Sequence, residues 1–249
     1  MDIGIISLFP EMFSAITAHG ITRRAVDNQH IQLHYFNPRD DAPPPQQRVD
    51  DRPYGGGPGM VMQVTPLQAA LIKAKQVLSD TAPVIALSPQ GQVLTQAILQ
   101  NLTDTPRLIM VCGRYEGIDE RFMQHVDLEL SLGDFVLSGG ELAAMVVIDG
   151  IIRLLPGALG DAQSAEQDSF SHGLLDHPHY TRPEVINQQA VPKVLLSGNH
   201  QAIKRWRLQQ ALGRTWLRRP DLLAQLDLTP EQQLLLDEFI KDTIREPHA

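Results

Sequence analysis

The sequence predicts an α/β fold in which a mainly parallel sheet forms one domain and a small helical domain follows it. In the first part of the chain, short runs rich in Ile, Val and Leu alternate with helical stretches. After residue 152 a polar stretch replaces this alternation, and two helical stretches follow. A chain of 249 residues, 43% of them apolar, is also long enough to bury a large core.

Five strands are predicted, because each apolar run is short and is bounded by Gly, Pro or Asp. They cover residues 3–9, 31–36, 83–88, 107–113 and 126–132. Since helical stretches separate most of them, we expect the strands to run parallel in one sheet.

Capping signals mark the predicted helices. A Ser or Thr stands three residues before a Glu or Gln at Thr65 and Gln68, at Ser138 and Glu141, and at Thr229 and Gln232. The helices are expected over residues 65–78, from 140 towards 151, over 198–212 and over 229–245. An earlier helix should end at Gly20, since glycine favours the position that follows a helix.

The loss of alternating apolar runs and helical stretches after residue 152 predicts the domain organisation. We expect residues 1–156 to form the sheet domain, 157–175 a flexible linker and 176–249 a helical domain.

Composition excludes several classes of protein. No window of about 18 consecutive apolar residues exists, and Asp2 and Glu11 stand where a signal peptide would carry positive charge. The only cysteine, Cys112, can form no internal disulfide and no cysteine-rich zinc site, and packing is its expected role. We therefore expect a soluble cytoplasmic protein without a membrane partner.

The net charge of −8 hides a basic segment. Residues 193–219 carry seven Lys or Arg and no acidic residue, so this segment has a charge of +7 and the remainder −15. Both tryptophans, Trp206 and Trp216, lie in it. Basic groups interleaved with aromatic rings suit a phosphate backbone with stacked bases. The alternative is a solvated helix face anchored by two buried tryptophans.

The glycine-rich stretch 49–60, VDDRPYGGGPGM, is a weak candidate for phosphate or nucleotide binding. It follows no strand and contains Pro58, unlike a dinucleotide fingerprint, so a plain glycine turn is the alternative. No P-loop, kinase or serine-elbow motif occurs in the chain.

Three loops follow predicted strands, at residues 87–91, 112–119 and 132–141. Ligands of open α/β sheets bind at the carboxyl ends of strands, so these loops predict a pocket for a small polar molecule. Glu116 and Asp134 would be its polar groups. Ordinary turns, with Ser138 as a cap, are the alternative.

The polar stretch holds carboxylates and histidines that suit acid–base or metal chemistry: Asp161, Glu166, Asp168, His172, Asp176, His177 and His179. Zinc is weakly supported, because Pro178 intervenes and no helical histidine pair occurs. A loop carboxylate that works near Arg153 fits better, although these patterns do not single out which carboxylate it is.

Ten short motifs, spread in order from Ile6 to Pro220, carry a resemblance to a known family. They are ISLFPEMF, VDDRPYGGGPGM, LSPQG, CGRYEGIDER, GDFVLSGGE, EQDSF, LLDHPHYTRP, LLSGNH, RWR and GRTWLRRP. Together they resemble the bacterial tRNA (guanine-N1)-methyltransferases of the SPOUT superfamily. That resemblance implies a deep trefoil knot, a homodimer with its active site at the subunit interface, and methyl transfer from S-adenosylmethionine to N1 of guanine 37, next to the anticodon.

The resemblance also implies roles for individual residues. The cofactor would lie against Leu87, Ser88, Pro89, Gly113, Tyr115, Glu116, Leu132, Gly133, Asp134, Phe135, Val136, Leu137, Gly139 and Gly140. Asp168 would be the general base and Arg153 its partner on the guanine, while Asn199, His200, Arg205 and Arg207 would hold the tRNA. Mg²⁺ is implied as a further cofactor, without an assigned position.

Four residues depart from the family pattern. They are Ala86 and Phe135 in place of Tyr, Ala143 in place of Pro, and His177 in place of Cys. The first two bear on adenosine contacts, and the last argues against a zinc site shared by the family. A non-catalytic tRNA-binding module and a ribose 2′-O-methyltransferase of the same superfamily are the competing hypotheses.

Overall fold

The computed structural model describes residues 1–159 and 168–245. The chain divides into two compact units, Met1–Asp161 and Ala162–Ala249, each of which is described by itself. None of the helices in the described residues combines the length and apolar composition needed to cross a membrane.

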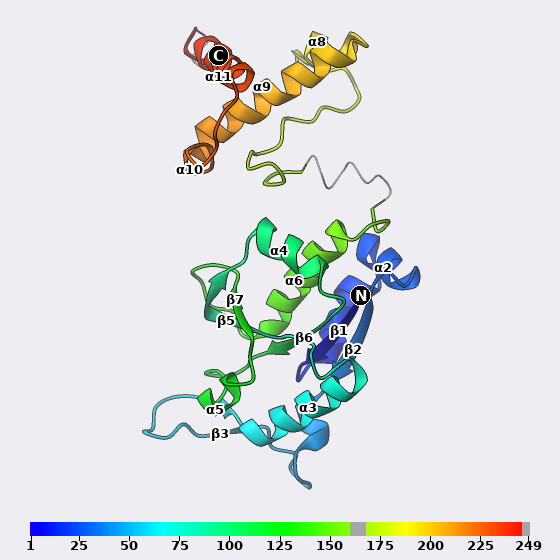
Figure 1. The fold of residues 1–249 in the computed structure, drawn as a ribbon, viewed down its shortest axis with the longest axis vertical. Helices are drawn as coiled ribbons and strands as arrows, with labels where there is room; N and C mark the ends of the chain where they lie inside the picture. Colours follow the sequence, from blue (N-terminus) through cyan, green and yellow to red (C-terminus); the bar gives the residue numbers. More distant parts are fainter. Residues whose placement is uncertain (160–167, 246–249) are drawn as a thin grey trace. The chain divides into compact units, whose positions relative to one another are not determined.

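A five-stranded parallel sheet forms the centre of the first unit (Figure 1). Its strands are β1 (Asp2–Ile6), β2 (Gln32–Phe36), β5 (Val84–Val93), β6 (Arg107–Cys112) and β7 (Leu128–Ser131). Their order is β2-β1-β6-β5-β7, and every pair is parallel. The predicted α/β fold with a parallel sheet is confirmed, because all five apolar runs form its strands.

Helices cover both faces of this sheet (Figure 1). On β6, Leu108, Met110 and Cys112 face a core shared with α2 (Gly20–Asp27), α4 (Gln96–Thr103) and α6 (Gly140–Leu154). Ile109 and Val111 point to the opposite core, with α3 (Val64–Val77) and α5 (Glu120–Met123). The alternation follows from the two-residue period of a strand. Burial on both faces explains why these strands are continuous apolar runs.

Short elements connect the sheet to its helices. They are the 3-10 turns η1 (Pro10–Phe13) and η2 (Pro38–Asp41), helix α1 (Ser14–Thr17), and the strand pair β3 (Asp50–Asp51) and β4 (Val61–Met62). The predicted helix before Gly20 is broken into η1 and α1. Gly20 has a φ of +67°, as a helix-ending glycine does, but it also begins α2, which the sequence pattern did not predict.

Two of the three predicted capping boxes are wrong. Helix α3 begins at Val64, one residue before the predicted cap Thr65, and α6 has Gly139 as its cap with no side-chain hydrogen bond. Glu141 does not turn back to the backbone of Ser138, because a buried ion pair holds its carboxylate. The third box is confirmed in α11 (Pro230–Arg245), where Thr229 and Gln232 exchange hydrogen bonds of 2.8 and 3.2 Å.

The second unit is mainly helical. A small hairpin of β8 (Val185–Ile186) and β9 (Gln189–Ala190) precedes α8 (Lys193–Leu196), α9 (His200–Arg218) and α10 (Pro220–Leu223). Leu212 of α9 and Leu235 and Leu236 of α11 form its buried core, and Trp216 packs against them. The close approach of these two helices requires Gly213, because a Cβ there would overlap the Phe239 ring.

Candidate functional site: a loop-lined pocket and a basic helix

A pocket of about 440 Å³ lies where β5, β6 and β7 end. Twelve of the fourteen residues predicted to hold a small molecule line it: Leu87, Ser88, Pro89, Gly113, Tyr115, Glu116, Leu132, Phe135, Val136, Leu137, Gly139 and Gly140. Gly133 and Asp134 belong to the same loop but do not line the pocket. The rule that ligand sites form at the carboxyl ends of parallel strands therefore located this cavity from the sequence.

Further lining residues were not singled out by the sequence patterns. They include Gln90, Arg114, Ile118, Glu120, Met123 and Glu129. Arg114 and Glu120 stand within the recognised motif CGRYEGIDER, whereas Met123 lies beyond it in the short helix α5, which no periodicity predicted. Helices of one turn carry too little pattern for such a prediction.

An irregularity in β5 places the first loop at the pocket. Both Leu87 and Gln92 are paired with Leu130 of β7, so the residues between them leave the ladder. Gly91 makes this bend feasible, because a Cβ there would overlap the backbone of the neighbouring strand. The backbone N–H of Gln90 donates to the Ser88 hydroxyl over 3.1 Å, which stabilises the turn of the loop.

A buried ion pair joins the loops that surround the pocket. Arg114 Nε donates to Glu141 Oε2 over 2.8 Å, and the Ser7 hydroxyl donates to Glu141 Oε1 over 2.8 Å. The Glu141 side chain is fully buried, and the Arg114 side chain is only 17% exposed. Arg114 also donates to the carbonyl oxygen of Ser138 over 3.2 Å, and its guanidinium lies 4.6 Å from the centre of the Phe9 ring. The end of β1, the loop after β6 and the start of α6 are thus held together.

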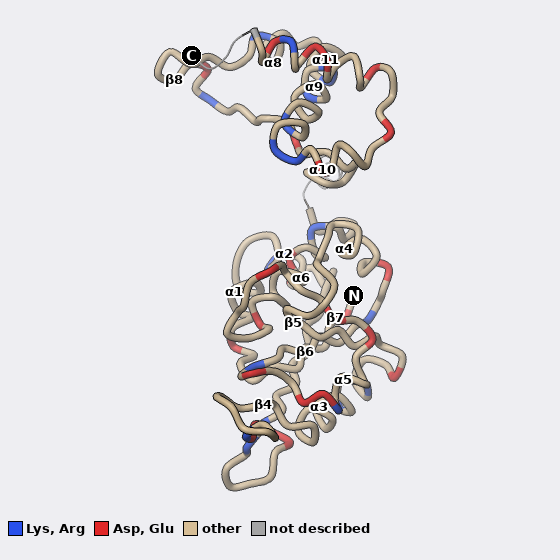
Figure 2. Tube along the Cα trace, turned by 90° about the vertical axis from the view of Figure 1, so that its left-hand side faces the viewer, with Lys and Arg blue, Asp and Glu red and all other residues tan. Residues whose placement is uncertain are grey.

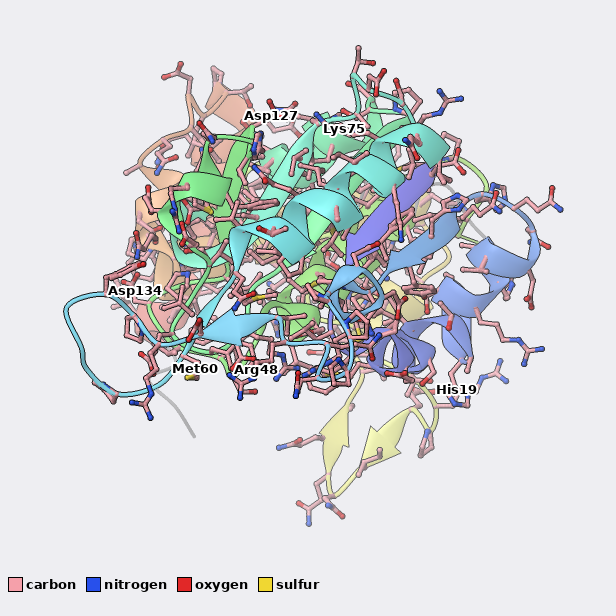
Figure 3. The ribbon with its side chains drawn as sticks, turned by 90° about the horizontal axis from the view of Figure 1, so that it is seen from below. His19, Arg48, Met60, Lys75, Asp127 and Asp134 are labelled. Atoms are coloured by element: carbon pink, nitrogen blue, oxygen red, sulfur yellow. The ribbon has the colours of Figure 1, made fainter. Side chains whose placement is uncertain are left out.

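The glycine-rich loop between β3 and β4 is anchored to the pocket at one end. The backbone N–H of Glu116 donates to the carbonyl oxygen of Met60 over 2.9 Å, and that of Met62 donates to Gly117 over 2.9 Å. A Cβ on Gly59 would overlap the Glu116 side chain, so glycine is needed there for contact with a pocket residue. Figure 3 labels Met60 at the base of this loop.

Cys112 is the last residue of β6 and is fully buried. Burial, reinforced by the Glu141 carboxylate, raises the pKa of its thiol well above the usual value. A thiol without thiolate character at neutral pH is no nucleophile, so the predicted packing role is confirmed.

Gly140 sets how closely α6 approaches β6. A Cβ at this position would lie 2.8 Å from the Cα of Cys112 and 3.0 Å from the backbone nitrogen of Gly113. We expect Gly140→Ala to destabilise the protein by about 1–3 kcal/mol, because neither backbone atom can move aside. Urea unfolding followed by circular dichroism measures this effect. Ser138→Ala, a change in the same loop that adds no bulk, is the control, and equal unfolding midpoints for the two variants would contradict the argument.

The two residues predicted for acid–base chemistry belong to different units. Arg153 lies in the last turn of α6 and is half-buried. Asp168 is half-buried in the second unit, where its carbonyl oxygen accepts from the backbone N–H of Ser171 over 3.3 Å. Two further candidate carboxylates, Asp161 and Glu166, lie outside the described residues.

The basic positions recur along α9 and at its end, in blue in Figure 2. Two of the four predicted tRNA-binding residues, Arg205 and Asn199, have hydrogen-bond partners within the protein. Arg205 donates from Nη2 to both oxygens of Glu238 at 2.9 Å, and Asn199 caps α9 by accepting from the N–H of Ala202 over 3.1 Å. His200 begins α9 and Arg207 lies further along it. Beyond α9, Arg219 is paired with Asp221.

The motif LLDHPHYTRP brings polar and aromatic side chains together beside α9. His177 and His179 have ring centres 4.5 Å apart, and Trp206 lies 6.5 Å from His177 and 6.3 Å from Tyr180. Burial lowers the pKa of His177 below its usual value, and the nearby Asp176 opposes this shift.

Comparison with known proteins places the chain in a family. A family model described as tRNA (Guanine-1)-methyltransferase TrmD matches residues 1–225. A tRNA (guanine-N(1)-)-methyltransferase of Aeromonas hydrophila is 60% identical over 97% of this chain and 98% of its own length. Proteins of the same name from Shewanella sediminis and Idiomarina loihiensis are 60% and 58% identical, covering 97% and 96% of this chain and 100% and 96% of their own lengths. The chain therefore belongs to the tRNA (guanine-1)-methyltransferase family.

Proposed function

We propose that this protein transfers a methyl group from S-adenosylmethionine to N1 of guanine 37 of tRNA, immediately 3′ of the anticodon. The chain is a tRNA (guanine-N1)-methyltransferase, because its relatives carry that name and match it over 97% of its length. The single observation that carries the proposal is the pocket at the ends of β5, β6 and β7, built from the residues that the family motifs contribute.

The pocket suits a nucleoside cofactor that carries an amino-acid group. Its volume of about 440 Å³ lies within the range of small-molecule sites. Leu87, Leu132 and Leu137 provide apolar walls for an adenine ring, and the backbone of the three loops offers hydrogen-bond donors and acceptors. Glu116 provides a negative charge for a cationic ligand. S-adenosylmethionine, when bound, supplies an electrophilic methyl group on a sulfonium centre. The trefoil knot of the family would comprise these same three loops.

The chemistry of guanine gives Asp168 and Arg153 complementary roles. N1 of guanine carries a proton at neutral pH, and a base must remove it as the nitrogen lone pair attacks the methyl group. Asp168 accepts this proton, and the Arg153 guanidinium stabilises the negative charge that accumulates on O6. A carboxylate in water is a weak base, so we expect either desolvation on substrate binding to strengthen Asp168 or Arg153 to acidify the guanine. Exclusion of water favours this charge-dispersing step.

We infer that a second copy of the chain completes the active site. Leu142 and Val146 are 45% and 49% exposed on α6, and their helical spacing places them on the same face as Arg153. Exposed apolar side chains on one face of a helix favour contact with another protein surface. In the proposed homodimer this face meets the partner, and Asp168 of one protomer works with Arg153 of the other.

The basic helix α9 would bind the tRNA. The target guanine must leave its stack to reach a pocket, which requires a firm hold on the surrounding backbone. Arg207 and His200 are candidates for phosphate contacts, with Arg205 and Asn199 beside them on or next to α9. The tRNA-binding role rests on the family and on the charge of residues 193–219. The proposed cytoplasmic location rests on the tRNA substrate.

Arg207 and Arg205 should differ in their effect on tRNA binding. Arg205 already has Glu238 as an ion-pair partner, so Arg207 is the better phosphate ligand. We expect Arg207→Ala to weaken tRNA binding more than Arg205→Ala, and to lower the slope of log K against log salt by about one unit. Filter binding at several salt concentrations measures both quantities. Unchanged affinity in both variants would refute the assignment of this segment.

Mg²⁺, which the resemblance implies, enters no step here. The acidic lining residues Glu116, Glu120 and Glu129 form no group of three converging ligands among the described residues. The part of the chain that the structure describes therefore shows no carboxylate cage of the kind that would place this ion at the pocket.

The position of the new methyl group tests the proposal against its two alternatives. Methylated tRNA is digested with nuclease and the modified nucleoside is identified by mass spectrometry. We expect 1-methylguanosine from position 37. A 2′-O-methylated nucleoside would support the ribose methyltransferase, and binding without any methylated product would support a non-catalytic module.

A further inference from the structure

Asp176, His177 and His179 form a cluster of potential metal ligands in the second unit, and none of the three has a role in the proposed methyl transfer. One ligand atom from each lies within 4.8 Å of the others. Among the described residues, this is the only group of three or more His, Cys, Asp or Glu side chains with that property. The extended chain between Leu175 and Tyr180 contains no regular element, so the cluster does not follow from helical spacing.

The donor atoms converge on one carboxylate. His179 Nε2 lies 2.8 Å from Asp176 Oδ2, and His177 Nε2 lies 3.8 Å from Asp176 Oδ1. The other ring nitrogen of His177, Nδ1, lies 3.2 Å from the carbonyl oxygen of Pro178. In the tautomer with its proton on Nδ1, His177 donates to that carbonyl and keeps a lone pair on Nε2 for a metal ion. Metal-ligating histidines are commonly oriented by a carbonyl group in this way.

The surroundings hold the cluster in place and leave one side open. The side chains of His177 and Asp176 are only 12% and 23% exposed, whereas that of His179 is 71% exposed. The Asp176 carboxylate is fixed by the backbone N–H of His177, which donates to it over 2.6 Å. The Trp206 ring packs on the side of His177. An ion could therefore reach the cluster beside His179, where it would replace the hydrogen bond between His179 Nε2 and Asp176 Oδ2.

We propose that Asp176, His177 and His179 bind a divalent transition-metal ion of the Zn²⁺ class, with solvent in the remaining coordination positions. Two imidazole nitrogens and one carboxylate oxygen are ligands that Zn²⁺ and Co²⁺ accept, whereas Mg²⁺ prefers oxygen alone. The positive charge of Arg207 acts on His177 and would repel a metal cation as well. Coordination by the three donor atoms, rather than long-range attraction, must therefore hold the ion. The site depends on His177, which stands where the family pattern has Cys. It goes beyond the proposed methyl transfer, because neither Asp168 nor Arg153 is part of it.

Co²⁺ is a suitable probe, because its d–d absorption reports coordination by the protein and it can quench a neighbouring tryptophan. The untagged full-length chain is freed of metal with a chelator and titrated with Co²⁺ in millimolar Mg²⁺. We expect saturable binding of one Co²⁺ per chain, with a visible d–d band and quenching of Trp206, and displacement of Co²⁺ by Zn²⁺.

Substitution of the ligands separates this site from binding elsewhere. His177→Phe keeps an aromatic ring against His179 but removes Nε2, and His179→Phe removes the second imidazole. Each should lower Co²⁺ affinity by more than about 100-fold, since loss of an outer-shell partner alone costs 10–100-fold. His172→Phe, a change to a histidine outside the cluster, is the matched control and should leave the affinity unchanged.

A further variant distinguishes loss of a metal ligand from loss of the fold. Asp176→Asn keeps the shape of the side chain and should also weaken Co²⁺ binding, while circular dichroism shows that the fold is retained. Equal affinity of the wild-type protein and His177→Phe, or the absence of saturable binding, would overturn the proposal and leave a hydrogen-bonded cluster.

Discussion

Asp168→Ala is expected to reduce the rate of methyl transfer by about 10²–10⁴-fold, the usual contribution of a general base, while cofactor binding survives. Asp168 belongs to the unit Ala162–Ala249, whereas the residues that line the pocket belong to Met1–Asp161. Loss of its carboxylate should therefore leave the pocket intact. Single-turnover methylation with saturating tRNA measures the chemical step, and calorimetry with S-adenosylmethionine measures binding.

One control and one partner variant make the Asp168 result specific. Glu184→Ala removes an exposed carboxylate from the same unit and should retain full activity. Arg153→Met should lower the rate in the same way as Asp168→Ala, and the double variant should lose less than the product of the two effects, because the residues act on one transition state. If Asp168→Ala also lost cofactor binding, Asp168 would be structural rather than the base.

Glu141→Ala is expected to lower the free energy of unfolding of the sheet unit by about 3–5 kcal/mol, the cost of breaking one side of a buried ion pair. The substitution leaves the Arg114 guanidinium, 17% exposed, without its carboxylate, and it leaves the Ser7 hydroxyl without an acceptor. Since the same pair links three of the segments around the pocket, S-adenosylmethionine affinity should fall as well. Urea unfolding followed by circular dichroism measures the stability.

The location of the tryptophans provides an internal control for the Glu141 experiment. Trp206 and Trp216 both belong to the second unit, so tryptophan fluorescence follows that unit alone. We expect the fluorescence transition of Glu141→Ala to stay near that of the wild type. Ser7→Ala removes a hydroxyl that donates to Glu141 and accepts from the backbone N–H of Phe9, and it should cost less, about 1.5–3 kcal/mol. A Glu141→Ala variant as stable as Ser7→Ala would show that the ion pair does not hold the pocket loops.

The sheet and the pocket were predictable because their signals are local. A strand buried on both faces must be a continuous apolar run, and residues 107–113 could be recognised as β6 on that ground alone. Loops rich in Gly, Ser and Pro that follow such strands must lie at one edge of a parallel sheet, which locates the pocket. The knot, by contrast, is expected from the resemblance only.

The interactions that could not be predicted join residues far apart in sequence. Glu141 has the spacing of a capping residue, but its carboxylate pairs with Arg114, 27 positions away. Arg205 belongs to an uninterrupted basic segment, yet it pairs with Glu238, 33 positions away on α11. Neither partner can be identified from charge spacing along the chain.

The proximity of Asp176, His177 and His179 was not predictable from helical spacing. A zinc site near His177 had little support from the sequence, because Pro178 intervenes and no pair of histidines there has helical spacing. In the extended chain, both His177 and His179 instead contact the carboxylate of Asp176. His172, which the sequence grouped with them, lies outside the cluster of potential ligands.

The most direct test of the central claim compares two tRNA transcripts that differ only at the base 3′ of the anticodon. Methyl incorporation from labelled S-adenosylmethionine is measured with guanine and with adenine at that position. The proposed reaction predicts incorporation into the guanine transcript alone. Incorporation into neither transcript, with S-adenosylmethionine still bound, would contradict the proposal and favour a tRNA-binding module, and equal incorporation into both would contradict N1 of this guanine as the acceptor.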